Sequence, residues 1–91
     1  MNQQRVTTEL IACLRQAQEL GGREVPILDD TLRPLSNLPG FDSLVAEEVI
    51  SWLEARLGHE LPHHTALFLY EEHHSSIAQI SERLYEILNA A

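Results

Sequence analysis

Apolar residues recur at helical spacing in three stretches of the chain, and no stretch shows the alternation typical of a strand. The first stretch, from about Gln3 to Leu20, ends at a glycine pair, which is typical of a helix C-terminus. The second, from about Ser43 to Leu57, ends at Gly58, and its apolar face consists of Ala46, Val49, Ile50, Leu53 and Leu57. The third starts behind Ser76, which with Gln79 forms a capping-box pattern, and its apolar stripe consists of Ile77, Ile80, Leu84, Ile87 and Leu88. The pattern predicts an all-α fold.

The connections between these helices are unequal in length. The first, about residues 21–42, holds three of the four prolines, which interrupt helices. Because so long a loop is unusual in a compact domain, we expect its apolar residues to pin it over the core, namely Ile27, Leu28, Leu32, Leu35, Leu38 and Phe41. We also expect a short helical turn around residues 32–38 and, after Pro62, a short third helix at about residues 65–70. The predicted architecture is a four-helix bundle with a long first loop, formed as one domain by residues 1–91.

The charge balance narrows the classes of partner. The chain carries 14 acidic residues and 6 basic ones, all arginine, which gives a formal charge of -8. Nucleic acids and anionic membranes are therefore not expected as partners, whereas proteins with basic patches are. The segment Met1 to Arg5 is polar and lacks the apolar region of a signal peptide, and no apolar run is long enough to span a membrane. We expect a cytoplasmic monomer in which the single cysteine, Cys13, is buried as a small apolar residue.

The candidate chemistry lies at the start of the second long helix, in the run Pro39-Gly40-Phe41-Asp42-Ser43-Leu44. Either Asp42 or Ser43 is expected to cap this helix, since both side chains can accept hydrogen bonds from its free N–H groups. The same N–H groups and the helix dipole favour an anion, so a phosphate ester on Ser43 would be stabilised there. A nucleophilic serine needs a base and an oxyanion hole, and the sequence shows neither beside Ser43. We interpret Ser43 as a residue that receives a group and expect no catalytic residue.

One side of the same helix has the composition of a docking surface. The helical wheel places Leu44 almost opposite the core face, where it should be exposed. Carboxylates surround it, and two further apolar side chains flank it. We call the docking face the set of Leu44, Val45, Glu47, Glu48, Trp52 and Glu54, and expect it to bind partner proteins.

These features together resemble the acyl carrier protein family. The motif Asp42-Ser43-Leu44 opens the helix, Leu61-Pro62 is similar to the family's isoleucine-proline turn, and Ser75-Ser76-Ile77 is similar to the start of its last helix. The resemblance implies that a phosphopantetheinyl transferase links a 4'-phosphopantetheine arm from coenzyme A to Ser43, with Asp42 beside it. The arm would hold acyl groups as thioesters for acyl-transferring or ketoacyl synthase-type enzymes, whose basic patches would meet the docking face.

The chain departs from the family pattern at several positions. Glu47 stands where the family usually has an apolar residue, and Val45 replaces a commonly polar one. With the prolines of the first loop and the absence of lysine, these departures favour a specialised fatty-acid, lipid or polyketide carrier. A peptidyl carrier shares the fold, although Phe41 argues mildly against it. A helical interaction module that is never phosphopantetheinylated is the second hypothesis.

Two further functions, a hydrolase and a metal-binding protein, have less support in the sequence. Asp42-Ser43-Leu44 is similar to part of the motif of the Gly-Asp-Ser-Leu hydrolases, but Phe41 replaces the glycine and the chain is too short for their sheet-based fold. Five histidines lie late in the chain, at His59, His63-His64 and His73-His74. Their spacing matches no known zinc pattern, so we expect solvated histidines and no metal site.

Overall fold

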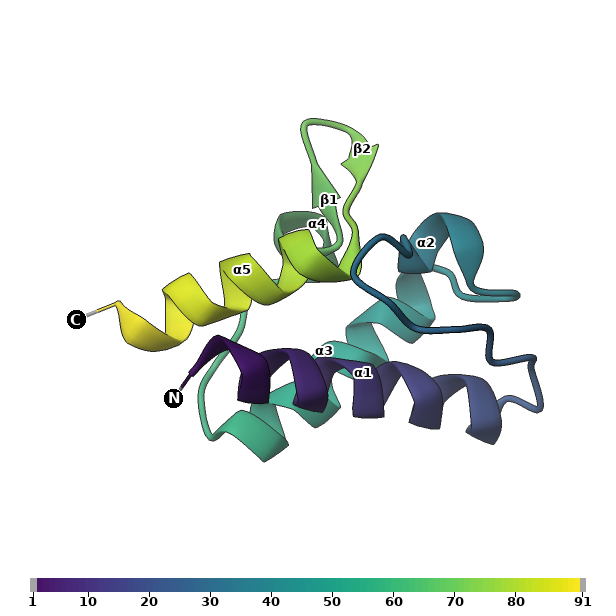
Figure 1. Cartoon of the computed structure of the whole chain (residues 1–91), viewed down its shortest axis with the longest axis horizontal. Coiled ribbons are helices and arrows are strands. Elements are labelled where there is room, and N and C mark those ends of the chain that lie inside the picture. The colour runs from purple at the N-terminus through teal and green to yellow at the C-terminus, as the bar shows by residue number, and fades with distance from the viewer. Residues whose placement is uncertain (1, 91) are drawn as a thin grey trace.

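The computed structural model describes residues 2–90, which form five helices and a two-stranded antiparallel sheet (Figure 1). Met1 and Ala91, the ends of the predicted domain, lie outside the described residues. The helices are α1 (Gln3–Leu20), α2 (Pro34–Asn37), α3 (Ser43–Leu57), α4 (His64–Leu67) and α5 (Ile77–Asn89), and the strands are β1 (Leu69–Tyr70) and β2 (His73–His74). The chain is thus mostly helical, as the sequence predicts, with a small hairpin that the sequence pattern does not predict.

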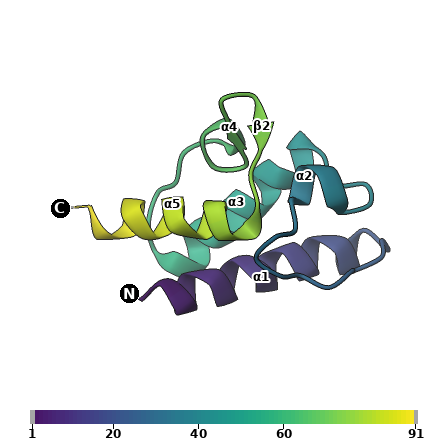
Figure 2. The same ribbon diagram turned by 45° about the horizontal axis from the view of Figure 1, so that its top comes forward.

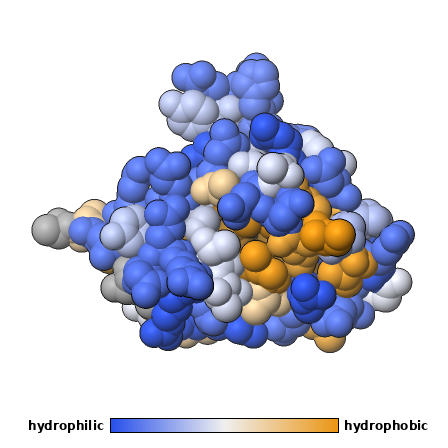
Figure 3. Space-filling model, viewed as in Figure 1, coloured by the Kyte–Doolittle hydropathy of each residue, from blue (hydrophilic) through white to orange (hydrophobic). Residues whose placement is uncertain are grey.

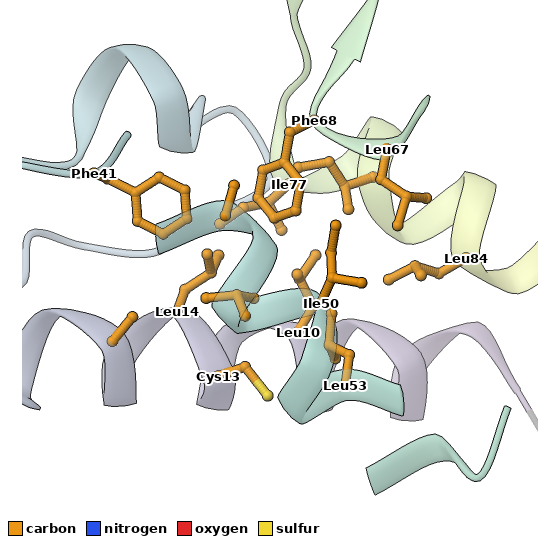
Figure 4. Packing of buried hydrophobic residues seen from close by; sticks show 14 of the residues in the cluster. Leu10, Cys13, Leu14, Phe41, Ile50, Leu53, Leu67, Phe68, Ile77 and Leu84 are labelled. Atoms are coloured by element: carbon orange, nitrogen blue, oxygen red, sulfur yellow. The ribbon is translucent and has the colours of Figure 1, made fainter. Parts of the chain in front are cut away.

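The three long helices share one core. Helix α1 packs against both α3 and α5, and Figures 1 and 2 show it running below α5, with α3 crossing behind it in Figure 1. Figure 4 shows apolar side chains from all three helices converging on the segment around α4, among them Leu10, Ile50 and Leu84. Cys13 is buried as expected, and burial raises the pKa of its thiol. Among the described helices, none is both long and apolar enough to cross a membrane.

The boundaries predicted for the long helices are confirmed, because local capping signals define them. The α5 capping box is present, with Ser76 and Gln79 satisfying each other's backbone N–H groups. Gly58 ends α3 with a φ of 66°, a left-handed conformation that glycine adopts without steric cost. All five apolar residues predicted for the core face of α3 are buried.

The long loop is pinned to the core partly as predicted. The expected helical turn is present as α2, and Leu32, Leu38 and Phe41 are buried. The prediction is wrong for Ile27, which is 84% exposed because its neighbour Leu28 takes the inward position. Figure 3 shows an apolar patch over this loop and the adjacent part of α1.

A buried polar side chain provides a further anchor for this loop. Gln18 is fully buried in α1, and its Nε2 donates to the carbonyl oxygens of Glu24 at 3.2 Å and Pro39 at 2.8 Å. Both ends of the loop are therefore tied to the same residue. Because a buried carbonyl without a partner is costly, Gln18 helps to hold the segment that leads into α3.

The predicted short third helix is wrong in its second half. Helix α4 ends at Leu67, and the following residues instead pair in a hairpin, Leu69 opposite His74 and Tyr70 opposite His73. The turn residues Glu71 and Glu72 have φ values of 48° and 68°, which residues other than glycine and asparagine rarely adopt. Arg83 of α5 holds the base of this hairpin by donating to the carbonyl oxygen of Leu67 at 2.7 Å. Tertiary contacts thus override the local helical preference.

Candidate functional site

Ser43 is the first residue of α3 and its side chain is exposed. The cap is Asp42, whose carboxylate accepts a hydrogen bond from the backbone N–H of Val45 at 3.0 Å. Among the side-chain hydrogen bonds within residues 2–90, none involves the Ser43 hydroxyl. The helix therefore does not need Ser43 as its cap, and the hydroxyl is accessible to solvent.

The segment before Ser43 is held firmly against the core. Phe41 is buried, and its ring centroid lies 5.8 Å from that of Phe68. Gly40 turns the chain with a φ of 68°, and a Cβ atom at this position would collide with the side chain of Arg23. The carbonyl of Pro39 is tied to Gln18. These contacts place an exposed hydroxyl on a rigid support.

The structure divides the docking face into exposed and half-buried parts. Leu44 is 78% exposed, and Glu48 also projects into solvent. Val45 and Trp52 are half-buried, pack against the core and line a hollow of about 240 Å³ beside the end of α1. The exposed Leu44 next to Ser43 therefore lies near two apolar side chains that are packed against the core.

Two glutamates of the docking face have partners inside the protein. One carboxylate oxygen of Glu47 accepts from the backbone N–H of His64 at 3.0 Å and lies 2.6 Å from Nδ1 of the same residue. Its other oxygen lies 3.4 Å from Nδ1 of His63. Glu54 accepts from the backbone N–H of Leu61 at 2.8 Å. Glu47 therefore connects α3 to α4, and Glu54 holds the loop between them.

The expectation of solvated histidines is wrong for His64. Its side chain is 19% exposed, whereas that of His63 is 88% exposed, because the ring of His64 turns inward to Glu47. The hydrogen bonds from the ring and then the backbone of His64 lower the pKa of Glu47 from 4.5 to about 2. The described residues include no group of three or more histidine, cysteine, aspartate or glutamate side chains arranged to hold a metal ion.

The low pKa of Glu47 predicts a specific pH dependence of stability. Its folded value of about 2 lies below the ordinary 4.5, so the ionised carboxylate stabilises the fold above about pH 5 and loses that effect as the pH falls toward 2. We expect Glu47→Gln to cost about 1 kcal/mol at pH 5, since the group is partly solvent-screened, and about half of that at pH 3. Urea unfolding at both pH values measures the difference. The exposed Glu48→Gln is the matched control, and an equal cost of Glu47→Gln at both pH values would contradict the prediction.

The roles of Gln18 and Arg83 and the pairing of Glu47 with His64 were not predicted from the sequence. Gln18 did carry a signal, because it lies four residues after Leu14 on the apolar face of α1. The other contacts join residues that are distant in sequence, so no local pattern reveals them. Comparisons with protein-family models, with curated proteins and with solved structures found no match.

Proposed function

We propose that this chain is an acyl carrier protein, in which α1, α3, α4 and α5 form the carrier's four-helix bundle and Ser43 holds a 4'-phosphopantetheine arm. The observation that carries the proposal is the exposed Ser43 hydroxyl at the first turn of α3, left free because Asp42 provides the cap. A serine that capped the helix would be needed for stability. A serine that does not cap, on a rigid support, is suited to modification by another enzyme.

The position suits the chemistry of loading. A phosphopantetheinyl transferase would join Ser43 Oγ to the phosphorus that bears the pantetheine in coenzyme A, and the nucleotide would leave. The resulting phosphodiester is an anion at the N-terminus of a 15-residue helix, where free N–H groups and the helix dipole stabilise it. The thiol at the far end of the arm would then carry an acyl group as a thioester.

The surface around Ser43 is suited to short-lived complexes with several enzymes. Leu44 and Glu48 are exposed beside it, on a chain with a formal charge of -8. Opposite charge on a partner accelerates encounter, and a small apolar contact allows fast release. We therefore propose acyl-transferring or ketoacyl synthase-type enzymes with basic patches as partners, in a fatty-acid, lipid or polyketide pathway.

Loading by a transferase tests the proposal. We expect the folded chain, incubated with coenzyme A and a promiscuous phosphopantetheinyl transferase, to gain the mass of one phosphopantetheine, with peptide mapping placing it on Ser43. Ser51→Ala, at another exposed serine of α3, should load normally. A folded protein of unchanged mass would instead support the second hypothesis, an interaction module that binds through Leu44 and Trp52.

A further inference from the structure

A second serine lies in a polar groove between α2 and the β hairpin. The groove has a volume of about 540 Å³, within the range of small-molecule sites, and Ser36, His74 and Arg33 line it. Ser36 Oγ lies 2.5 Å from Nδ1 of His74, although the two residues are 38 positions apart in the sequence. We propose that Ser36 and His74 form a nucleophile and base pair that accepts a short acyl group from an activated ester or thioester.

Two hydrogen bonds to backbone carbonyl oxygens hold the elements around the pair together. Ser36 lies in α2 and His74 in β2, and Arg33, which precedes α2, donates a hydrogen bond to the carbonyl oxygen of His74. The loop before α2 is also bound to the start of α5, since the carbonyl of Leu32 accepts from the N–H of Ile77 at 2.9 Å. Both residues are exposed, and the elements that carry them are held together by these contacts, which positions the pair for reaction.

The chemistry needs only groups present in the groove and the acyl donor. With the ring proton on Nε2, Nδ1 of His74 accepts the hydroxyl proton as Ser36 Oγ attacks the carbonyl carbon. The guanidinium of Arg33 can donate to the oxygen on which negative charge develops. The bond from carbon to the leaving oxygen or sulfur then breaks, the leaving group departs, and the imidazolium returns its proton to that group or to water. The product is an ester on Ser36.

The backbone of the hairpin sets the position of His74. Glu71 and Glu72 are both in the left-handed region, a conformation that costs free energy in residues other than glycine. Their turn delivers His74 to Ser36 and places Glu72 on the wall of the groove. A two-residue hairpin turn requires positive φ at both positions, so this conformation fixes where β2 presents His74.

Acylation by p-nitrophenyl acetate tests the pair, followed by intact mass and peptide mapping of the full chain. The chain suits this reagent because it has no lysine, the usual source of background acetylation. We expect one acetyl group on Ser36, absent in Ser36→Ala and formed about a hundredfold more slowly in His74→Asn. His73→Asn, at the neighbouring exposed histidine of the same strand, is the matched control and should react at the normal rate.

The pH profile of the natural chain provides an independent measurement. The rate at Ser36 should rise with pH in the natural chain, because general-base catalysis needs an unprotonated base, and His74→Asn should lose this rise. The proposal would be overturned by acetylation scattered over several hydroxyls, by no acetylation at Ser36, or by a rate at Ser36 that does not depend on pH. These outcomes can be read from the natural chain even if His74→Asn fails to fold. Ser43→Ala should be acetylated at Ser36 at the normal rate, so the outcome is separate from that of the carrier proposal.

Discussion

Replacing Ser43 with alanine is expected to abolish phosphopantetheine loading completely while changing the free energy of unfolding by less than about 0.5 kcal/mol. Loading is lost because the acceptor oxygen is removed. Stability is retained because Ser43 is exposed and the N-cap bond comes from Asp42. Intact mass after incubation with coenzyme A and the transferase measures the first effect, and urea unfolding measures the second.

Asp42→Ala is the matched variant for this pair of measurements. It removes the acceptor for the backbone N–H of Val45, so we expect a loss of about 1 kcal/mol of stability. An equal loss in Ser43→Ala would mean that Ser43 also caps α3, and the observation that supports the carrier would fail. A full mass gain in Ser43→Ala would place the arm elsewhere.

Phe68→Ala is expected to destabilise the fold by about 3–5 kcal/mol. Phe68 is fully buried directly after α4, and it packs against Phe41, two residues before Ser43. Truncation would leave a large cavity beneath both the hairpin and the start of α3. Since domains of this size are stable by about 5–15 kcal/mol, the variant should be close to unfolding at room temperature.

Urea unfolding monitored by circular dichroism measures this loss. Phe68→Leu is the control, because it keeps most of the apolar volume and should cost clearly less than the alanine variant. Hydrogen exchange adds a local readout, since the N–H of Ser75 donates to the carbonyl of Phe68 and should lose protection in the alanine variant. A cost below about 1 kcal/mol for Phe68→Ala would show that this residue does not organise the core.

The long helices and the exposure of Ser43 and Leu44 could be predicted because they depend on local signals. Each long helix has an apolar face of several turns, and the α3 boundaries follow from Asp42 at one end and Gly58 at the other. A helical wheel is enough to place Leu44 away from the core once the core face is known. Such patterns involve residues that are close in the sequence, so they can be recognised without knowledge of the tertiary contacts.

The hairpin could not be predicted, because neither its strands nor its turn has the usual sequence. Each strand is only two residues long, and a Glu71-Glu72 turn replaces the Asn-Gly type that favours positive φ at both positions. The contacts of Arg83 with the carbonyl of Leu67 and with the ring of Tyr70, at 4.9 Å, supply the stability that the turn lacks. These contacts exist only after α5 has packed.

The sequence by itself determined a mostly helical chain with three long helices, the buried face of α3 and the accessible serine at its start. Only the tertiary structure decided that Glu47 is bound to His64 and that Ser36 meets His74. Helical periodicity is a property of neighbouring residues, whereas a side-chain hydrogen bond depends on the relative placement of whole elements. The free energy that sets this placement comes from burial of the shared core, which no single segment contains.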